Sequence, residues 1–408
     1  MTAASTTKIP WFILPVIVLS QFAGSSVWFA GNAILPALQS VYHLPANMVG
    51  NITTAVQLGF ISGTLLFALL TIADRFSPVK VFMLSALLAA LFNLLVIYTN
   101  GDTGFLLFLR FLTGFFLAGV YPVGMKIAAD WYAQGLGKAL GFLVGALVAG
   151  KALPHLLKGL NDVDRWKQVM IATSCFAATG GLLVGFLLKN GPHRSKGKAI
   201  SFRKISSLFK EKKFKAAAWG YFGHMWELYT FWAFVPVMLS TYNLQNGLQL
   251  KVSTWSFFII GIGAFSCIAG GYLSRSIGSA RVAFISLSAS GICCLLAPLF
   301  FYLPPALFIT ALLIWSCFVI ADSPQFSALV SQTADSNQKG TALTLTTSIG
   351  FAITIFSIEL MNYLITKPFA HSSILPSNTT IYYMLLAIGP LFGLISMRSL
   401  LNKKAINA

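Results

Sequence analysis

Charged side chains are scarce in this chain. Only 9% of the residues are Asp, Glu, Lys or Arg, and the acidic residues number 10 against 28 Lys and Arg. A soluble globular domain carries about a quarter charged residues. Hydrophobic residues make up 57% of the sequence instead. The composition therefore excludes an ordinary soluble domain, and the basic excess must be explained within a mostly apolar chain.

Cysteine is also sparse, and the motifs of several protein classes are missing. The five cysteines all fall within apolar runs, which offers neither a loop disulfide framework nor a spaced metal site. No GxxxxGK[ST] loop supports ATP-driven pumping. No clustered His/Asp set or nucleophile–base spacing indicates an enzyme, and no repeated filter sequence indicates a channel. We therefore expect no enzymatic activity, no metal and no cofactor.

What the chain has in abundance is long apolar runs. A helix needs roughly 20 mostly apolar residues to cross a bilayer, because no water is present inside to satisfy exposed backbone groups. We expect an all-α membrane protein with twelve transmembrane helices, the first a true span rather than a cleaved signal peptide. The predicted spans are 11–35, 49–72, 79–99, 104–128, 137–158, 167–188, 215–240, 253–273, 281–302, 305–329, 340–364 and 380–398.

The basic residues are distributed unevenly between alternating loops. With the N-terminus in the cytoplasm, most of the 28 Lys and Arg fall on the inner side, and the densest group runs from Lys189 to Lys215. The outer loops hold Lys158, Arg165, Lys167, Lys251 and Lys367. This is the positive-inside pattern, which places both termini in the cytoplasm. The charge therefore predicts topology and contact with lipid headgroups, and we expect no nucleic-acid partner.

The chain divides into two similar halves. We expect residues 1–188 to form an N-terminal six-helix bundle, 189–214 a basic cytoplasmic linker, and 215–408 a C-terminal six-helix bundle. TIADRFSPVK, between spans two and three, has its counterpart in GYLSRSIGSAR between spans eight and nine. Pro122 and Pro324 occupy corresponding places near the ends of spans four and ten. Such a repeat implies a pseudo-twofold axis along the membrane normal, with a substrate site between the halves.

These motifs resemble the major facilitator superfamily. Its loop signature after span two is Gly-x-Leu-x-Asp-Arg-x-Gly-Arg-Lys, of which the chain keeps Asp74, Arg75 and Lys80. Arg110 followed by Gly114 is similar to the superfamily's Arg-x-x-x-Gly element in span four. Span five lacks the adjacent Gly-Pro pair of the antiporter motif, which favours symport. The resemblance implies that spans 1, 4, 7 and 10 line a central cavity, with help from 2, 5, 8 and 11.

Ionisable residues within the spans follow this division. A charge inside a bilayer costs at least a few kcal/mol, so each one needs a partner, a wet cavity or a function. Away from their ends, spans 3, 6, 9 and 12, the outer supports in the superfamily, contain no Asp, Glu, Lys or Arg. Five such charged residues occur inside the other spans, on spans 4, 5, 7, 10 and 11: Arg110, Lys151, Glu227, Asp322 and Glu359.

Three of the buried ionisable residues are candidates for proton coupling. His224 and Glu227 lie one turn apart near the middle of span seven, and a carboxylate beside a histidine can exchange a proton near neutral pH. The alternatives are a structural hydrogen-bonded pair or an ion pair with a basic group of the other half. Asp322, on span ten, is either a proton site or a partner of the backbone freed by Pro324.

The substrate site is expected among polar and aromatic residues of the inner-lining spans. Lys151 and Arg110 could clamp an anionic group such as a carboxylate. Alternatively, Arg110 holds neighbouring helices through backbone carbonyls, and Lys151 pairs with Glu227 or Glu359. The full set of candidate substrate-binding residues is Lys151, Arg110, Gln21, Gln57, Tyr121, Trp226 and Tyr229.

Gating residues are expected at the cytoplasmic ends. The resemblance implies that Asp74 and Arg75 belong to an inner charge network that holds the outward-open state together. Pro122 and Pro324 should kink their helices, which suits a moving gate. Glu359, near the outer end of span eleven, is expected to be a gate or structural contact.

We hypothesise a monomeric secondary active transporter of a bacterial inner membrane. It would couple protons to the movement of a small solute by alternating access, with an anionic organic acid or chelator as the preferred solute and symport favoured. One alternative is proton-driven efflux of drug-like compounds or metabolites, since phenylalanine-rich spans could line an apolar pocket. A different alternative is a membrane sensor on the same scaffold that binds solute without moving it.

Overall fold

The computed structural model describes residues 9–132, 136–160, 165–194, 208–334, 339–366 and 376–401, and the regular elements among them are all helices. Among these residues, eleven helices or pairs of consecutive helices are long and apolar enough to cross a bilayer. The remaining predicted span is α11 (Lys212–Asn246), a helix of 35 residues whose His224, Glu227, tyrosines and tryptophans lower its hydropathy. The predicted all-α membrane architecture is confirmed.

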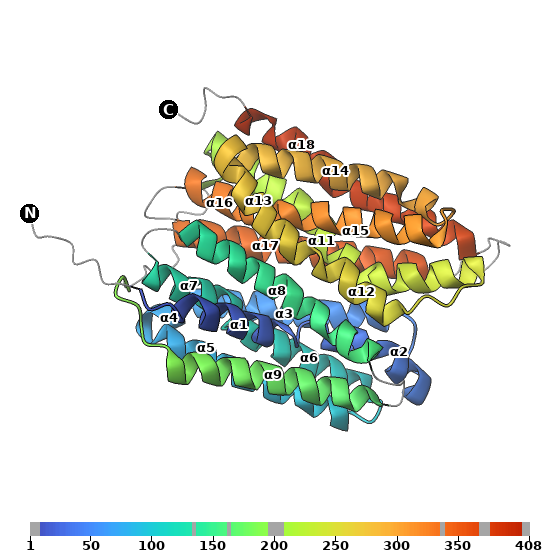
Figure 1. The fold of residues 1–408 in the computed structure, drawn as a ribbon, viewed down its shortest axis with the longest axis horizontal. Helices are drawn as coiled ribbons and strands as arrows, with labels where there is room; N and C mark the ends of the chain where they lie inside the picture. The colour runs from blue at the N-terminus through green and yellow to red at the C-terminus, as the bar shows by residue number, and fades with distance from the viewer. Residues whose placement is uncertain are drawn as a thin grey trace, which may run out of the picture.

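The first six predicted spans are built from nine helices, which lie together in Figure 1 in blue to green. They are α1 (Ile13–Ser25), α2 (Ala30–Tyr42), α3 (Met48–Leu69), α4 (Ile72–Arg75), α5 (Pro78–Leu95), α6 (Thr103–Leu117), α7 (Tyr121–Trp131), α8 (Leu136–Gly159) and α9 (Trp166–Leu187). A short 3₁₀ turn, η1 (Val96–Tyr98), extends α5. Of the predicted linker 189–214, residues 195–207 lie outside the described part of the chain.

The other six spans lie beside them, in yellow-green to red in Figure 1. After α11 come α12 (Val252–Gly261), α13 (Gly263–Ile277), α14 (Ser279–Phe300), α15 (Pro305–Ala321), α16 (Ser323–Thr333), α17 (Lys339–Thr366), η4 (Pro376–Ala387), α18 (Ile388–Met397) and η5 (Arg398–Leu400). The N-terminal start of α1 and the C-terminal end of α18 lie at the same end of the molecule, near α4 (Figure 1). We call this the terminal end, and the other the distal end.

Helices within each half approach closely where glycine is present. A Cβ atom on Gly59 of α3 would lie 1.9 Å from the carbonyl oxygen of Phe111 on α6, and one on Gly114 of α6 would lie 1.9 Å from that of Val56. Any side chain at either position would force the two helices apart. Small residues at such crossings are the usual way to bring helices together in a membrane, where apolar burial gives no driving force between them.

Four spans are interrupted rather than continuous. Predicted span four breaks between α6 and α7, span ten between α15 and α16, span one between α1 and α2, and span eight between α12 and α13. Pro122 and Pro324 each stand in the first turn of the second segment, where a missing N–H costs nothing. The kinks predicted from these two prolines are therefore present.

The two halves contact each other through α3 with α17 and through α8 with α12 and α13. Three hydrogen bonds cross between α3 and α17 or their ends. Thr54 donates to Glu359 at 2.5 Å, and Thr354 donates to Gln57 at 2.5 Å. Asn362 donates to the backbone carbonyl of Asn47 at 2.9 Å. These contacts lie toward the distal end, so the halves are joined there.

Candidate functional site

A cavity of about 970 Å³ lies between the two halves. It is lined by α3, α7 and α8 from the first half and by α11, α13, α16 and α17 from the second. Asp74, Lys126, Lys138 and Arg275 line it where these helices reach the terminal end. Lys138 and Arg275 are exposed, so the cavity reaches the surface at that end.

The deep wall of the cavity is aromatic. Tyr121 from α7 faces Tyr221, Tyr229 and Trp232 from α11, together with Phe351 from α17. The rings of Tyr229 and Phe351 lie 5.0 Å apart, and those of Tyr229 and Trp232 lie 5.5 Å apart. This wall offers flat apolar faces with a few hydroxyl groups. Of the predicted substrate-binding residues, Tyr121 and Tyr229 line the cavity.

Three other predicted substrate-binding residues lie elsewhere. Trp226 is on the opposite side of α11, where its indole N–H donates to the Leu385 carbonyl at 3.0 Å. Gln21 is fully buried and donates to Ser25 at 3.0 Å within α1. Gln57 is fully buried and accepts from Thr354. None of the three lines the cavity, because helix packing or a contact between the halves occupies each side chain.

His224 pairs with Asp322 behind the cavity wall. The Nδ1 atom of His224 lies 2.9 Å from Oδ1 of Asp322, and both residues are at most 1% exposed. Asp322 occupies the break between α15 and α16, and Ser323, Pro324 and Gln325 after it line the cavity. Beyond this ion-pair contact, neither the carboxylate oxygens of Asp322 nor the ring nitrogens of His224 have a hydrogen-bond partner among the described residues. The pair is thus buried and lies next to the cavity.

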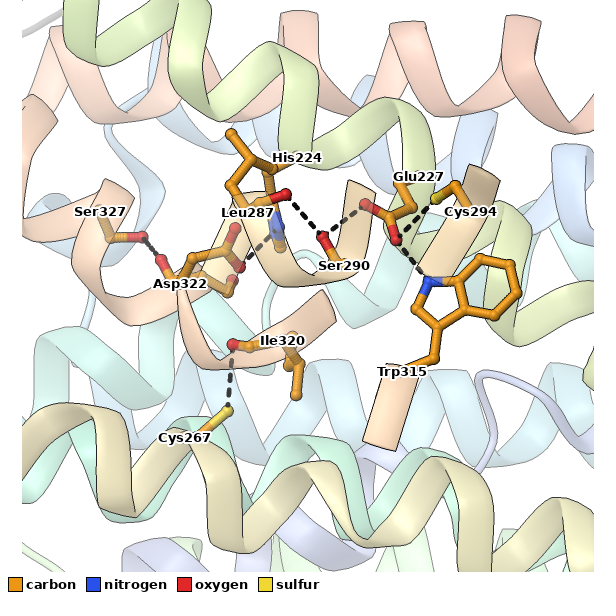
Figure 2. A network of polar contacts seen from close by, with 11 residues as sticks. His224, Glu227, Cys267, Leu287, Ser290, Cys294, Trp315, Ile320, Asp322 and Ser327 are labelled. Carbon is orange, nitrogen blue, oxygen red and sulfur yellow. Dashed lines mark hydrogen bonds and ion pairs between the residues drawn. The ribbon is translucent and has the colours of Figure 1, made fainter. Parts of the chain in front are cut away.

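Glu227 is directed away from this pair, as Figure 2 shows. Its carboxylate accepts hydrogen bonds from the Trp315 indole at 2.6 Å, the Ser290 hydroxyl at 3.0 Å and the Cys294 thiol at 3.3 Å. These donors belong to α14 and α15, so Glu227 joins three helices of the second half. The predicted pairing of His224 with Glu227 is therefore wrong. Residues three apart on a helix differ by about 60° in direction, which here separates their partners.

Lys151 lies in a box of aromatic rings. Its ammonium is 4.1 Å from the ring centre of Trp28, 4.4 Å from that of Tyr229 and 5.7 Å from that of Trp232, and it donates a hydrogen bond to the Tyr229 hydroxyl. Only 1% of the side chain is exposed. The described ion pairs do not include Lys151, so its predicted alternative partners Glu227 and Glu359 are not its partners in this structure.

Arg110 holds the broken first span. Its guanidinium donates to the carbonyls of Val27 and Trp28 at 2.8 and 2.6 Å, and to the side chain of Asn93 at 2.8 Å. The two carbonyls lie between α1 and α2, outside both helices, so no helical N–H donates to them. Arg110 is fully buried and does not line the cavity. The structure therefore places it in the alternative, helix-holding arrangement and not at the substrate site.

Comparison with known proteins decides the family. The family model described as Major Facilitator Superfamily matches residues 17–358. This chain belongs to the major facilitator superfamily. A search of curated protein sequences finds no match.

Solved structures of superfamily members share the fold at low sequence identity. A D-xylose–proton symporter superposes with a TM-score of 0.76 at 12% identity, covering 96% of this chain and 98% of the symporter. A mutant of the nucleoside transporter NupG gives 0.72 at 12% identity, covering 96% and 100%. A bacterial homologue of the human lysosomal transporter Spinster, in an inward-facing unoccupied conformation, gives 0.71 at 13% identity, covering 95% and 97%. The superfamily protein described here is thus a membrane transporter and not an enzyme.

Of the predicted gating residues of this major facilitator protein, Asp74 lies at the cavity mouth, whereas Pro122 and Pro324 line the cavity at the helix breaks. Asp74 forms a 2.8 Å ion pair with Lys126 of α7, which also lies 3.9 Å from Asp130. Arg194 donates to the backbone carbonyl of Asp74 at 3.1 Å. Arg75 is exposed beside them. The network joins α4 and α7 of the first half to Arg194 in the segment after α9, and the second half contributes no residue to these contacts.

Several residues of the transporter's site were not predicted from the sequence. Trp28 and Trp315 contact Lys151 and Glu227, and Lys126 pairs with Asp74. The two tryptophans carry no signal of their own among many aromatic residues. Lys126 did carry a sequence signal, because a lysine at the end of a span, four residues before Asp130, is placed to pair with acidic side chains.

Proposed function

We propose that this protein is a proton-coupled secondary active transporter that moves a small organic solute by alternating access. The observation that carries the proposal is a large cavity between the two halves, which reaches the surface at the terminal end, while cross-half contacts join the halves toward the distal end. Such a cavity exposes its wall to one side of the membrane at a time. Membership of the superfamily supports the same mechanism.

The moving bodies of the proposed mechanism are residues 1–188 and 215–408, with 189–214 as the cytoplasmic linker between them. The positive-inside distribution of Lys and Arg supports a cytoplasmic terminal end. With that orientation, the structure is an inward-open state. We also place the protein in a bacterial inner membrane as a monomer.

We assign proton coupling to His224 and Asp322. Both are buried, they lie 2.9 Å apart, and Asp322 immediately precedes cavity-lining residues. An acid and an imidazole in contact can hold or release one proton between them, which changes the charge of the pair from zero to minus one. In this assignment Glu227 holds α11 against α14 and α15.

The proposed substrate fits the wall that it would touch. Tyr121, Tyr229 and Trp232 line the cavity, and aromatic side chains with a polar group suit a solute that has both an apolar surface and polar substituents. The solute is therefore an organic molecule with a flat or apolar face and polar substituents. An acidic group remains the hypothesis that the sequence suggested; Lys151, directly behind Tyr229, supports it, and Arg110 no longer does.

The test is transport by purified protein in liposomes. A thermal-shift screen of organic acids, amino acids, chelators and common drugs selects a stabilising compound, and counterflow of that compound in labelled form is then measured. An imposed pH gradient should drive its accumulation. Binding without counterflow would show a sensor rather than a transporter. Matched acid and amide versions of the compound test the acidic group.

Proton-driven efflux is a second candidate function, favoured by the cavity wall. Phe67, Phe142 and Phe351 line it together with many aliphatic side chains, which suits a bulky apolar compound. The direction of the pH gradient distinguishes the candidates. An exporter expels the compound when protons flow inward, whereas a symporter accumulates it under the same gradient.

A further inference from the structure

Lys151 is a buried ammonium whose contacts are aromatic. It is 1% exposed, and the described part of the chain shows it in no ion pair. A charge removed from water needs compensation, which a carboxylate usually supplies. Here the compensation comes from the ring faces of Trp28, Tyr229 and Trp232 and from the Tyr229 hydroxyl. Three rings around one ammonium form an aromatic box.

The aromatic box is shared between the two halves. Lys151 on α8 and Trp28, between α1 and α2, belong to the first half. Tyr229 and Trp232, both on α11, belong to the second. Trp28 also contacts Tyr229 and Phe351 of the second half directly, at ring distances of 5.6 and 5.7 Å. The ammonium therefore lies between surfaces that must separate when the distal end opens.

The position of the box relates it to the closed end of the cavity. Tyr229 and Trp232 line the cavity on one side and contact Lys151 on the other. Toward the distal end follow the bonds between Thr354 and Gln57 and between Thr54 and Glu359. The box thus borders the cavity at its closed end, beside the other cross-half contacts there, such as the one between the rings of Phe60 and Phe351 at 4.8 Å.

We propose that the aromatic box is a binding site for a primary ammonium group, that Lys151 occupies it as a tethered ligand, and that this occupation holds the distal end closed. The attraction of a ring face for a cation depends on the positive charge, so a neutral side chain of equal size cannot replace it. Breaking the box removes contacts to two rings of the opposite half at once. The inference rests on the proposed alternating access, because it assumes that the halves separate at this end.

Spin-label distances test this proposal. One label pair, at Ser40 and Leu244, reports the distal end, since both are exposed near the distal ends of α2 and α11. A second pair, at Lys80 and Arg281, reports the terminal end from α5 and α14. Cys175, Cys293 and Cys317 are replaced to avoid stray labelling, whereas the buried Cys267 and Cys294 are kept.

The variants are Lys151→Ala, which empties the box, and Lys151→Met, which fills it without charge. In both we expect the ratio of distal-open to distal-closed molecules to rise by about tenfold or more, from the cation–π energy of a desolvated site. Ethylammonium chloride should restore the closed distance in Lys151→Ala, and ethanol or sodium chloride should not. Lys167→Ala is the matched control, because its ammonium lies 5.7 Å from Trp166 within one half.

Each possible result of these experiments either supports or overturns the proposal. Closed distances in Lys151→Met would show that charge is not required and would overturn the proposal. Opening of Lys151→Ala that ethylammonium does not reverse would overturn the ammonium site. Lys151→Met serves if Lys151→Ala does not fold. If the distances behave as expected but no solute shows counterflow, the transport function fails while the box stands.

Discussion

Replacing Asp322 by asparagine removes the proton-binding carboxylate while it leaves the packing of the side chain nearly unchanged. Asparagine has nearly the same shape, so the contact with His224 at 2.9 Å can persist without a proton being taken up or released. Loss of a charge-assisted hydrogen bond in a buried pair costs about 1.5–3 kcal/mol, which a multi-helix bundle should tolerate. We therefore expect Asp322→Asn to fold and to bind solute.

The magnitude of the coupling follows from one titrating pair. If His224 and Asp322 carry one proton per cycle, each pH unit supplies about 1.4 kcal/mol, which sustains about tenfold accumulation of an uncharged solute at zero membrane potential. With two pH units across the liposome membrane, the wild-type protein should approach about a hundredfold. Asp322→Asn should stop at equal concentrations on both sides.

The assay compares two measurements on the same liposomes. Accumulation of labelled solute under a pH gradient reports coupling, whereas counterflow at equal pH reports movement of the loaded carrier. Asp322→Asn should lose the first and keep the second, and His224→Gln should do the same. Undiminished accumulation in Asp322→Asn would refute the assignment of coupling to this pair.

Three further predictions concern the other charged side chains. Glu227→Gln should lower the free energy of unfolding by about 2–3 kcal/mol, because three hydrogen-bond donors lose their carboxylate acceptor. Accumulation driven by the pH gradient should persist in this variant. A stable variant that has lost coupling would instead support Glu227 as the proton site. Arg110→Met should fold poorly in a fluorescence size-exclusion assay, since it leaves the carbonyls of Val27 and Trp28 without donors at a cost of about 1–3 kcal/mol each. Arg110→Lys should recover part of this loss, and normal folding with selective loss of anion binding would contradict the prediction. Lys126→Met should change stability by less than about 1 kcal/mol, because Lys126 and Asp74 are 22% and 23% exposed, and a larger drop in thermal unfolding would show a stronger role for the mouth network.

The architecture was predictable because a bilayer imposes strong local rules. Spans of about 20 apolar residues, basic inner loops and the two matched prolines follow from hydropathy, electrostatics and the missing proline N–H. Pro122 and Pro324 consequently marked real breaks. The break between α1 and α2 was not predictable in this way, because no proline lies there. It depends on Arg110 of another helix, which supplies the missing donors.

The candidate site was predictable only in part, for a geometric reason. Helical periodicity shows that His224 and Glu227 lie within one turn, but it does not show which neighbouring helix each meets. Their partners, Asp322 and Trp315, both come from one interrupted span, Asp322 from its break and Trp315 from α15, and are about ninety residues distant along the chain. The prediction that Trp226 lies at the substrate site missed for the same reason, since Trp226 faces η4 rather than the cavity. Which side chains pair between helices can therefore be read only from the three-dimensional structure.

The place of Asp322 has a consequence for how a gate would be driven. It stands at the joint between α15, which Trp315 ties to Glu227, and α16, whose first residues border the solute path. Rotation at this joint would move the short helix α16 while α15 stays in place. The residue proposed to take up the proton then also lies at the hinge of the proposed gate, so no chain of contacts across the protein is needed to connect protonation with gating.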